Sequence, residues 1–315
     1  MTTGKFFVFL AAVAATAFVR AETAEHFIGY RHGFNRDVMA LQILLDRQNF
    51  SCNCVDGVWG KRSEIALMTW QMVNGKPPTG IPTDEILNEL GGTNDLYSVQ
   101  IVTTNDVNAL VTIPPEWENR AKLKSMGYES LQEMFAERGH TSFRGIERLN
   151  PQVAWPNPPV GTAITVPNCV CTIPAKRLKA ASVRIALTRM EISAFDANDV
   201  MIALFPCSIA KDKSKRPDGE LKIKAVAPNP TYTFNPQMYY PGTKERTKYI
   251  IPAGPNNPVG VAWVGLNLEG YGIHGTPQPE MIGQAASHGC FRLANWNAEK
   301  LLKMIQMDSY IWVEE

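Results

Sequence analysis

Apolar side chains recur at helical spacing in three stretches between residues 32 and 91. Asn35 can cap the first helix, whose apolar residues share one side: Val38, Leu41, Leu44 and Leu45. A turn-rich loop leads to a second helix from about Arg62 to Val73. Thr83 can cap a third helix, which carries acidic residues in its first turn and ends before Gly91. The pattern predicts a three-helix bundle over residues 32–91, the N-terminal module.

The pattern between residues 92 and 179 is less regular. Helices are indicated from Trp117 to Met126 and from Tyr128 to Arg138. A new segment begins at His140, after the helix that ends at Arg138, and we interpret His140 as a structural residue. Residues 161–167 then alternate as a short strand does. We predict a small α+β module over residues 96–168, the middle module.

Strand patterns dominate from residue 180 to residue 315, the C-terminal module. Two β-rich runs, Ala186 to Phe195 and Val200 to Ile209, surround a polar turn and predict a hairpin. Residues 261–266 and 272–274 form further apolar strands. Together the three modules predict a multidomain α+β fold with a β-dominated C-terminal part.

The remainder of the C-terminal module has weaker signals. Residues 229–258 are rich in Pro, Tyr and Asn and predict a long, ordered loop over the site of this module, as a lid or a substrate wall. Lys211 to Lys215 predicts a basic connection, which is solvated or guides an anionic substrate. Asn295 or Asn297 can cap a final helix, and a short strand from Tyr310 to Val313 closes the chain.

The first 21 residues have the pattern of an export signal. Lys5 precedes an apolar run from Phe6 to Phe18, and Val19-Arg20-Ala21 fits a small-x-small cleavage site. The run is short for a membrane span, although an uncleaved anchor is the alternative. Since no later run is long and apolar enough, we expect an exported protein of the periplasm or cell wall, with no further membrane segment.

Composition narrows the function classes. Hydrophobic residues make up 45% of the chain, and the net charge of +1 argues against a nucleic-acid partner. Export permits disulfides, but neighbours such as Cys52 and Cys54, or Cys169 and Cys171, bridge each other poorly. Bridges between these two pairs, or none, both stay open, and Cys207 is interpreted as structural.

Candidate chemistry is concentrated near the C-terminal end, in Ile273–Thr276 and Ala286–Arg292. A cysteine attacks carbonyl carbons as its thiolate, and a nearby imidazole can take the thiol proton. Adjacent glycines let backbone N–H groups approach an oxyanion. Cys290 is therefore predicted to be a nucleophile. The alternatives are a small buried side chain and a zinc ligand, but no fourth ligand with metal-site spacing lies nearby in the sequence.

The same block resembles the signature of the L,D-transpeptidase catalytic domain, the YkuD family: His-Gly-Thr, a spacer, then Ser-His-Gly-Cys-x-Arg. Every signature position is filled between His274 and Arg292. The resemblance implies a mixed β-sandwich and a peptidoglycan substrate. It also implies that Cys290 attacks the third residue of a stem tetrapeptide, releases D-Ala and leaves a thioester, which an amine acceptor then attacks. No metal or organic cofactor is implied.

Roles for the motif residues follow from the resemblance. His274 is the expected base, with the Gly275 carbonyl orienting its other ring nitrogen. Backbone N–H groups around Gly289 and Cys290 are expected to receive the oxyanion.

Four further motif positions are expected at the substrate site. His288 would shape the pocket and the field at the thiolate, and Ser287 would hold the loop by hydrogen bonds. Arg292 would hold the loop or bind a substrate carboxylate, with the structural role slightly favoured. Thr276 is expected at the wall of the site.

The first two modules have resemblances of their own. Leu41-Gln42, Val55–Gly60 and Thr69–Gln71 resemble the peptidoglycan-binding type 1 domain. Leu149–Pro151 and Gly161–Pro167 resemble part of a LysM carbohydrate-binding module, although the strand that opens a LysM module is not indicated. Glycan binding by either module is a hypothesis.

Two other functions fit the same residues. Water in place of the amine acceptor would make an L,D-carboxypeptidase that trims tetrapeptides. A cell-wall-binding scaffold with an inactive catalytic unit is the non-enzymatic alternative, which the filled signature disfavours. The identity of the diamino acid and of the acceptor stay open at this stage.

Overall fold

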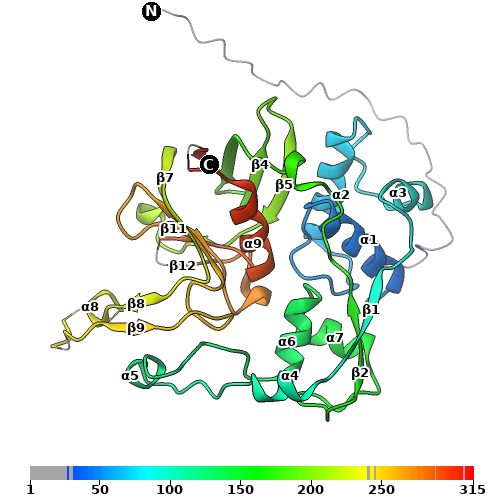
Figure 1. Ribbon diagram of the computed structural model, residues 1–315. Coiled ribbons are helices and arrows are strands. Elements are labelled where there is room, and N and C mark those ends of the chain that lie inside the picture. The colour runs from blue at the N-terminus through cyan, green and yellow to red at the C-terminus, as the bar shows by residue number, and fades with distance from the viewer. Residues whose placement is uncertain (1–26, 28–30, 240–241, 245, 288, 308) are drawn as a thin grey trace, which may run out of the picture.

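The computed structural model describes residues 27, 31–239, 242–244, 246–287, 289–307 and 309–315 (Figure 1). The predicted export signal at residues 1–21 lies outside the described residues, as does His288. Within the described part, no helix is long and apolar enough to cross a membrane. The structure is a mixed α+β arrangement in which helices dominate the first half and strands the second (Figure 1).

Three helices occupy the described part of the N-terminal module: α1 (Arg36–Arg47), α2 (Lys61–Val73) and α3 (Asp84–Glu89). The predicted caps of α1 and α3 are confirmed. The Asn35 side chain accepts the N–H groups of Asp37 and Val38, and the Thr83 side chain accepts that of Ile86.

Helix α1 is buried along nearly its whole length, from Val38 to Arg47. It is not a surface helix with one apolar stripe, because its core also takes in Leu149, Cys169 and Leu204 from later parts of the chain. The edge strand of the C-terminal module is covered here as well, since Ser51 N–H donates to the Leu204 carbonyl and Leu204 N–H to that of Asn49.

The middle module contains two strands and four helices in its described residues: β1 (Tyr97–Ile101), α4 (Thr104–Asn108), α5 (Trp117–Arg120), α6 (Leu131–Arg138), α7 (Phe143–Leu149) and β2 (Ala163–Pro167). Strands β1 and β2 pair antiparallel, and α6 and α7 share a core with β2 and with Val102, which follows β1. An opening strand therefore exists, contrary to the sequence prediction. It was missed because Val99 and Ile101 are exposed and leave no buried face in the pattern.

The helix predicted from Trp117 to Met126 is wrong beyond its first turn, since α5 ends at Arg120. Met126 instead bonds to the C-terminal module, through its N–H to the Ala253 carbonyl and its carbonyl to the N–H of Asn256. These tertiary bonds replace the helical bonds that local propensity favours. The next helix begins only at Leu131.

An eight-stranded sheet organises the described C-terminal module, in the order β13-β11-β10-β7-β14-β3-β4-β5. Its elements are β3 (Ser182–Ala186), β4 (Glu191–Phe195), β5 (Met201–Pro206), β7 (Gly219–Pro228), β10 (Ala262–Leu266), β11 (Gly272–His274), β13 (Phe291–Arg292) and β14 (Tyr310–Glu314). A separate pair is formed by β6 (Ile209–Ala210) and β12 (Ala285–Ser287). The predicted hairpin is confirmed as β4 and β5.

Helix α9 (Asn295–Met304) lies beside this sheet and contacts β7, β10 and β11 (Figure 1). Neither predicted asparagine caps it, since its N-cap is Ala294 and no side chain caps the helix. Both amides instead reach other modules. Asn295 donates to the Glu137 carboxylate, and Asn297 donates to the Ser51 hydroxyl.

The long loop predicted for residues 229–258 is wrong in kind. It contains β8 (Tyr232–Phe234), α8 (Pro236–Tyr239) and β9 (Tyr249–Ile251), and β8 and β9 pair as an antiparallel hairpin that extends from the molecule (Figure 1). The hairpin packs against the middle module, where Trp117 stacks on Phe234 at 4.1 Å between ring centroids. Its pairing depends on this distant contact, which no local pattern shows.

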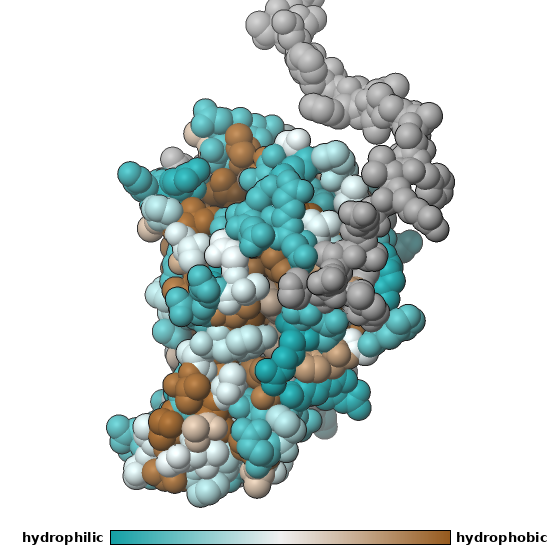
Figure 2. All heavy atoms as spheres, turned by 90° about the vertical axis from the view of Figure 1, so that its right-hand side faces the viewer, coloured by the Kyte–Doolittle hydropathy of each residue, from teal (hydrophilic) through white to brown (hydrophobic). Residues whose placement is uncertain are grey.

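The face formed by the first two modules is mixed in polarity. Figure 2 shows mainly hydrophilic atoms, with hydrophobic atoms in patches in both its upper part and its lower end.

Candidate active site

The two strands that carry the candidate catalytic pair are neighbours in the sheet. β11 and β13 pair in parallel, which aligns His274 with Arg292. Cys290 comes directly before β13, whose Arg292 exchanges two backbone hydrogen bonds with Ser208. The sequence motif thus becomes one edge of the sheet.

Cys290 and His274 line the same cavity, of about 700 Å³. Its wall also contains charged and aromatic side chains: Lys215, Tyr232, Trp263, Glu269, Tyr271 and Arg292. Of these, only Arg292 was a predicted site residue. The others come from the basic loop, the hairpin and the strand ends, and residues of that kind carry no local motif.

The pKa of the Cys290 thiol is raised above its ordinary value, which favours the thiol over the thiolate. Burial raises its pKa, while the Gly272 N–H and the Arg292 guanidinium act in the opposite direction. Its Sγ donates to the Gly270 carbonyl at 3.3 Å, and no hydrogen bond joins the described side chains of Cys290 and His274. The group is therefore a thiol held near a base, not a preformed ion pair.

The imidazole of His274 is held in one tautomer. Only 4% of the residue is exposed, and its Nδ1 lies 2.6 Å from the Gly275 carbonyl oxygen. A carbonyl only accepts, so Nδ1 carries the proton and Nε2 is the free base. Burial lowers the pKa of His274 to about 4, with the Gly275 carbonyl opposing and Arg292 adding to the shift. The ring stacks on Trp263 at 5.6 Å.

The Gly275 carbonyl is fixed by close packing. A Cβ on Gly275 or on Gly260 would overlap the Asn295 side-chain oxygen, and one on Gly260 would also overlap the Gly275 backbone. Asn295 in turn accepts the Val261 N–H at 3.4 Å. Gly260 and Asn295 thus orient the base from one step away, and sequence reasoning did not identify either in this role.

The loop at the nucleophile is held by Ser287. Its hydroxyl donates to the Cys290 carbonyl at 2.5 Å and accepts the Gly289 N–H at 3.3 Å. The Gly289 N–H is thus engaged at rest, so the oxyanion role predicted for it requires a shift. The oxyanion role of the Cys290 N–H stays a prediction.

The remaining predicted residues differ in position. Arg292 is half-buried, lines the cavity, and its Nε has no hydrogen-bond partner among the described residues. Thr276 is buried and accepts the Gln278 N–H, and it is not among the described residues that line the cavity. Its wall role stays a prediction. His288 lies outside the described residues.

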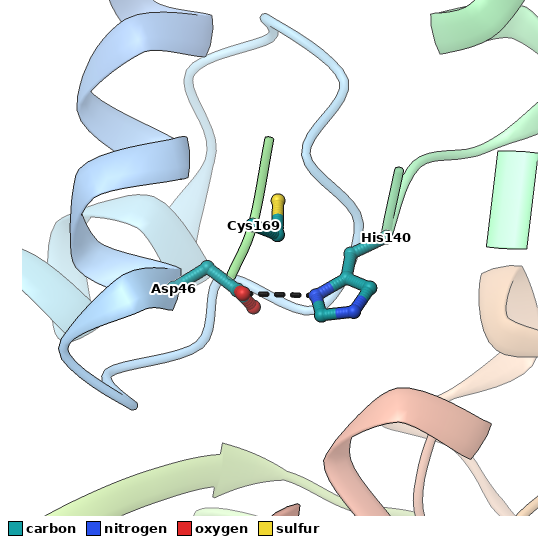
Figure 3. A group of neighbouring side chains, drawn as sticks. All are labelled: Asp46, His140 and Cys169. Carbon is teal, nitrogen blue, oxygen red and sulfur yellow. Dashed lines mark hydrogen bonds and ion pairs between the residues drawn. The ribbon is translucent and has the colours of Figure 1, made fainter. Parts of the chain in front are cut away.

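Asp46, His140 and Cys169 form the one group with metal-ligating atoms close together in the described part, all within 4.8 Å (Figure 3). Lys300 already lies 2.5 Å from the Asp46 carboxylate, and His140 Nδ1 lies 2.9 Å from the same oxygen. Burial opposes ionisation of Asp46, but Lys300 and His140 outweigh it and hold its pKa at about 2.

Burial raises the pKa of the Cys169 thiol well above its usual value, and the Asp46 charge raises it further. Lys300 supplies the positive charge that neutralises the buried Asp46 carboxylate. We therefore interpret Asp46, His140, Cys169 and Lys300 as a structural cluster built around a buried ion pair. With Trp296, which stacks on His140 at 5.2 Å, we call them the Asp46 junction. It joins helix α1, the middle module and α9.

All six cysteines lie in the described part of the chain and are free thiols. The sequence left open bridges between the two cysteine pairs or no bridge, and the structure contains no bridge.

Residues 181–313 match the family model of the L,D-transpeptidase catalytic domain, YkuD, and residues 35–90 match that of a putative peptidoglycan binding domain. Neither match includes residues 91–180, so the LysM resemblance stays a prediction.

Curated relatives carry related names. Putative L,D-transpeptidase YqjB of Bacillus subtilis is 28% identical over 36% of this chain and 59% of its own length. Probable L,D-transpeptidase ErfK/SrfK of Escherichia coli is 27% identical over 58% of each chain. The chain thus spans less than two thirds of the length of these relatives.

Among solved structures, L,D-transpeptidase 3 of Mycobacterium tuberculosis is 13% identical, with a TM-score of 0.35 over 43% of this chain and 61% of that chain. The two family matches show a YkuD L,D-transpeptidase catalytic domain at residues 181–313 and an N-terminal peptidoglycan-binding domain at residues 35–90.

Proposed function

We propose that the protein is an L,D-transpeptidase that acts on peptidoglycan stem peptides through a cysteine thioester. One observation carries the proposal: a thiol and an imidazole whose tautomer is fixed with Nε2 as the base line the same cavity. This is the pairing that nucleophilic catalysis by cysteine requires. The filled motif and the family match of residues 181–313 support it.

Acylation begins from the neutral pair. The Cys290 proton moves to Nε2 of His274 as sulfur bonds to the carbonyl carbon of the third stem residue. The carbonyl oxygen becomes an oxyanion, for which one good N–H donor contributes about 3–4 kcal/mol. Collapse breaks the C–N bond to D-Ala, and the imidazolium returns its proton to the departing amine. The thioester remains.

The second half-reaction runs in the same site. An acceptor amine attacks the thioester carbon, His274 takes a proton from that amine, and the thiolate leaves. The thiolate then regains the proton from His274. The low pKa of His274, about 4, favours the return of the proton from the imidazolium, and it makes the neutral imidazole a weak base for the steps in which it takes a proton.

The charges in the cavity suit a zwitterionic peptide. Arg292 and Lys215 are cations, and Glu269 is an anion, on the wall of one cavity. The Arg292 Nε is buried without a partner among the described residues, which is costly unless a ligand satisfies it. We therefore revise the role of Arg292 toward binding a substrate carboxylate.

Location and wall binding belong to the same proposal. A protein that acts on peptidoglycan has to be exported, in agreement with the pattern of residues 1–21. The domain at residues 35–90 would hold the enzyme at the wall.

Intact-mass spectrometry with ertapenem tests the nucleophile. This carbapenem has an activated amide, so we expect one covalent adduct on the wild type and none on Cys290→Ala. Cys171→Ala is the matched control, because Cys171 is also a free, partly exposed thiol but lies outside the cavity, and it should be acylated like the wild type. An adduct that persists in Cys290→Ala would end the proposal.

Product analysis tests the reaction itself. Purified disaccharide-tetrapeptide should yield D-Ala and cross-linked dimers with the wild type. Release of D-Ala with only tripeptide formed would instead establish an L,D-carboxypeptidase. Neither product, with the enzyme acylated by ertapenem, would contradict the proposed substrate.

A further inference from the structure

The segment that leads to Cys290 is held by side chains of the peptidoglycan-binding domain. Arg62, on α2, donates from Nη2 to the carbonyl of Ile282. Asn53 donates from Nδ2 to the carbonyl of Pro279 at 2.8 Å. Both carbonyls lie just before β12 (Ala285–Ser287), in the stretch between the catalytic histidine and the catalytic cysteine.

The Arg62 contact is closely fitted. Gly283 has a φ of +85°, and a Cβ at this position would overlap the Arg62 guanidinium. The guanidinium therefore rests directly on glycine backbone. No carboxylate forms an ion pair with Arg62 among the described residues, and its hydrogen bond there goes to the Ile282 carbonyl. An arginine fitted against glycine and bonded to a backbone carbonyl restrains the segment, whereas a surface charge would not.

Asn53 is itself held from the catalytic side. Its backbone has a φ of +74°, and its N–H donates to the Ser51 hydroxyl at 3.0 Å. The same hydroxyl accepts a hydrogen bond from Asn297 on α9, also at 3.0 Å. Helix α9 thus fixes the loop that carries Asn53. The contacts of Asn53 with Pro279 and Ser51, and of Ser51 with Asn297, therefore link the two domains in both directions.

The restraint continues to the nucleophile. The Ser208 hydroxyl accepts the N–H groups of Gly283 and Gln284, at 3.1 and 3.3 Å. Next, β12 pairs with β6, and Ser287 bonds to the Cys290 carbonyl. Hydrogen bonds thus connect the described residues from Ile282 to Cys290. A displacement of Ile282 would therefore change the position of the Cys290 thiol.

We propose that Arg62 and Asn53 are positioning residues for Cys290, so that the peptidoglycan-binding domain completes the nucleophile loop as well as anchoring the enzyme. The inference rests on the proposed function for its readout. A misplacement of about 1 Å at a reacting group can reduce the rate on the order of 100-fold, which sets the scale of the expected effect.

The test is the kinetics of ertapenem acylation in the full-length protein, with the saturating rate and the half-saturating concentration measured separately. We expect Arg62→Ala to lower the saturating rate about 10- to 100-fold with little change in half-saturation. Arg62→Lys, which keeps a donor, should recover part of the rate. Asn53→Ala should lower the rate in the same direction.

Arg144→Ala is the matched control. Arg144 lines the same cavity as Arg62 and Asn53, carries the same charge as Arg62 and is exposed. We expect its rate to equal that of the wild type. Melting temperatures identify any variant that is slow only because it unfolds.

Two failures are distinguishable. If the wild type is not acylated, the proposed function fails. If the wild type is acylated and folded Arg62→Ala reacts at the same saturating rate, the positioning role is wrong. The rate of Cys290 alkylation by iodoacetamide in the same variants is a readout that does not depend on transpeptidation, and it should fall with Arg62→Ala as well.

Discussion

Two histidines of the chain have similar surroundings, and yet we propose different roles for them. His274 in the cavity and His140 at the Asp46 junction each stack on a tryptophan and each bond through Nδ1. Each also has a cysteine nearby, Cys290 in one case and Cys169 in the other. A histidine with a cysteine is therefore not sufficient for a catalytic site, and the difference lies in what surrounds the pair.

The Nδ1 partner sets the first difference. His274 donates to a backbone carbonyl, which is neutral, while His140 lies against the ionised Asp46. The second difference is the charge at the thiol. Burial raises the pKa of both thiols; the Gly272 N–H and Arg292 oppose this shift at Cys290, whereas at Cys169 the Asp46 charge adds to it and Lys300 and Arg47 oppose it. Cys290 is also half-buried and lines the cavity of about 700 Å³, whereas Cys169 is buried and lines a cavity of about 390 Å³. Charge and access together distinguish a reactive thiol from a structural one.

Replacing each histidine by alanine gives the largest expected contrast. His274→Ala should lower the rate of ertapenem acylation about 10²- to 10⁴-fold, because the general base is lost. His140→Ala should leave the rate within about twofold while the protein is folded, and should lower its melting temperature, since Asp46 loses a buried partner. Stopped-flow acylation and calorimetry of both variants are the measurements. Equal rate losses in both would contradict the assignment of the base.

The catalytic role of Cys290 and His274 stays a prediction, and the sequence could indicate it because both residues lie in one short block. Glycines and reactive side chains at fixed spacing between His274 and Arg292 indicate both the chemistry and the turn. The Asp46 junction was not predictable. His140 and Asp46 are 94 positions apart, and nothing local marks either as the partner of the other. His140 was correctly interpreted as structural, but without its partner.

The sequence-based predictions of helices and strands failed where tertiary contacts override local conformational preference. The β8–β9 hairpin was predicted as a loop because its packing against Trp117 is distant in sequence. Strand β1 was missed because its apolar residues face solvent, and α5 is short because Met126 bonds to another module. The caps at Asn35 and Thr83 succeeded, since a cap needs only its own helix.

Removing the cation of the junction should give the next largest effect. Lys300→Met keeps the aliphatic length of the side chain but leaves Asp46 as a buried charge with His140 as its remaining side-chain partner. Breaking a buried pair in this way costs about 3–5 kcal/mol. Denaturant unfolding should show this loss.

Lys303→Met on the same helix is the matched control, because its ion pair with Glu299 is exposed. It should cost no more than about 1 kcal/mol. An equally small loss in Lys300→Met would contradict the inference that the buried ion pair of the Asp46 junction stabilises the fold.

Acid separates the two histidine sites by smaller, opposite tests. Asp46 has a pKa of about 2, below its ordinary value of 3.8, so its contribution of about 2 kcal/mol is complete above pH 4 and is lost as pH falls toward 2. Asp46→Asn should be less stable at pH 7 but should lose less stability across that acid range than the wild type.

The pH dependence of the acylation rate should instead follow the protonation of His274. Because its pKa is about 4, the base is neutral from pH 5 upward, so the rate should be flat between pH 5 and 8 and fall only near pH 4. That acid limb should be the same in Lys303→Met and the wild type. A limb near pH 6.5 would show that the base titrates like an exposed imidazole, and the buried, carbonyl-bound His274 would then not be the group that takes the proton.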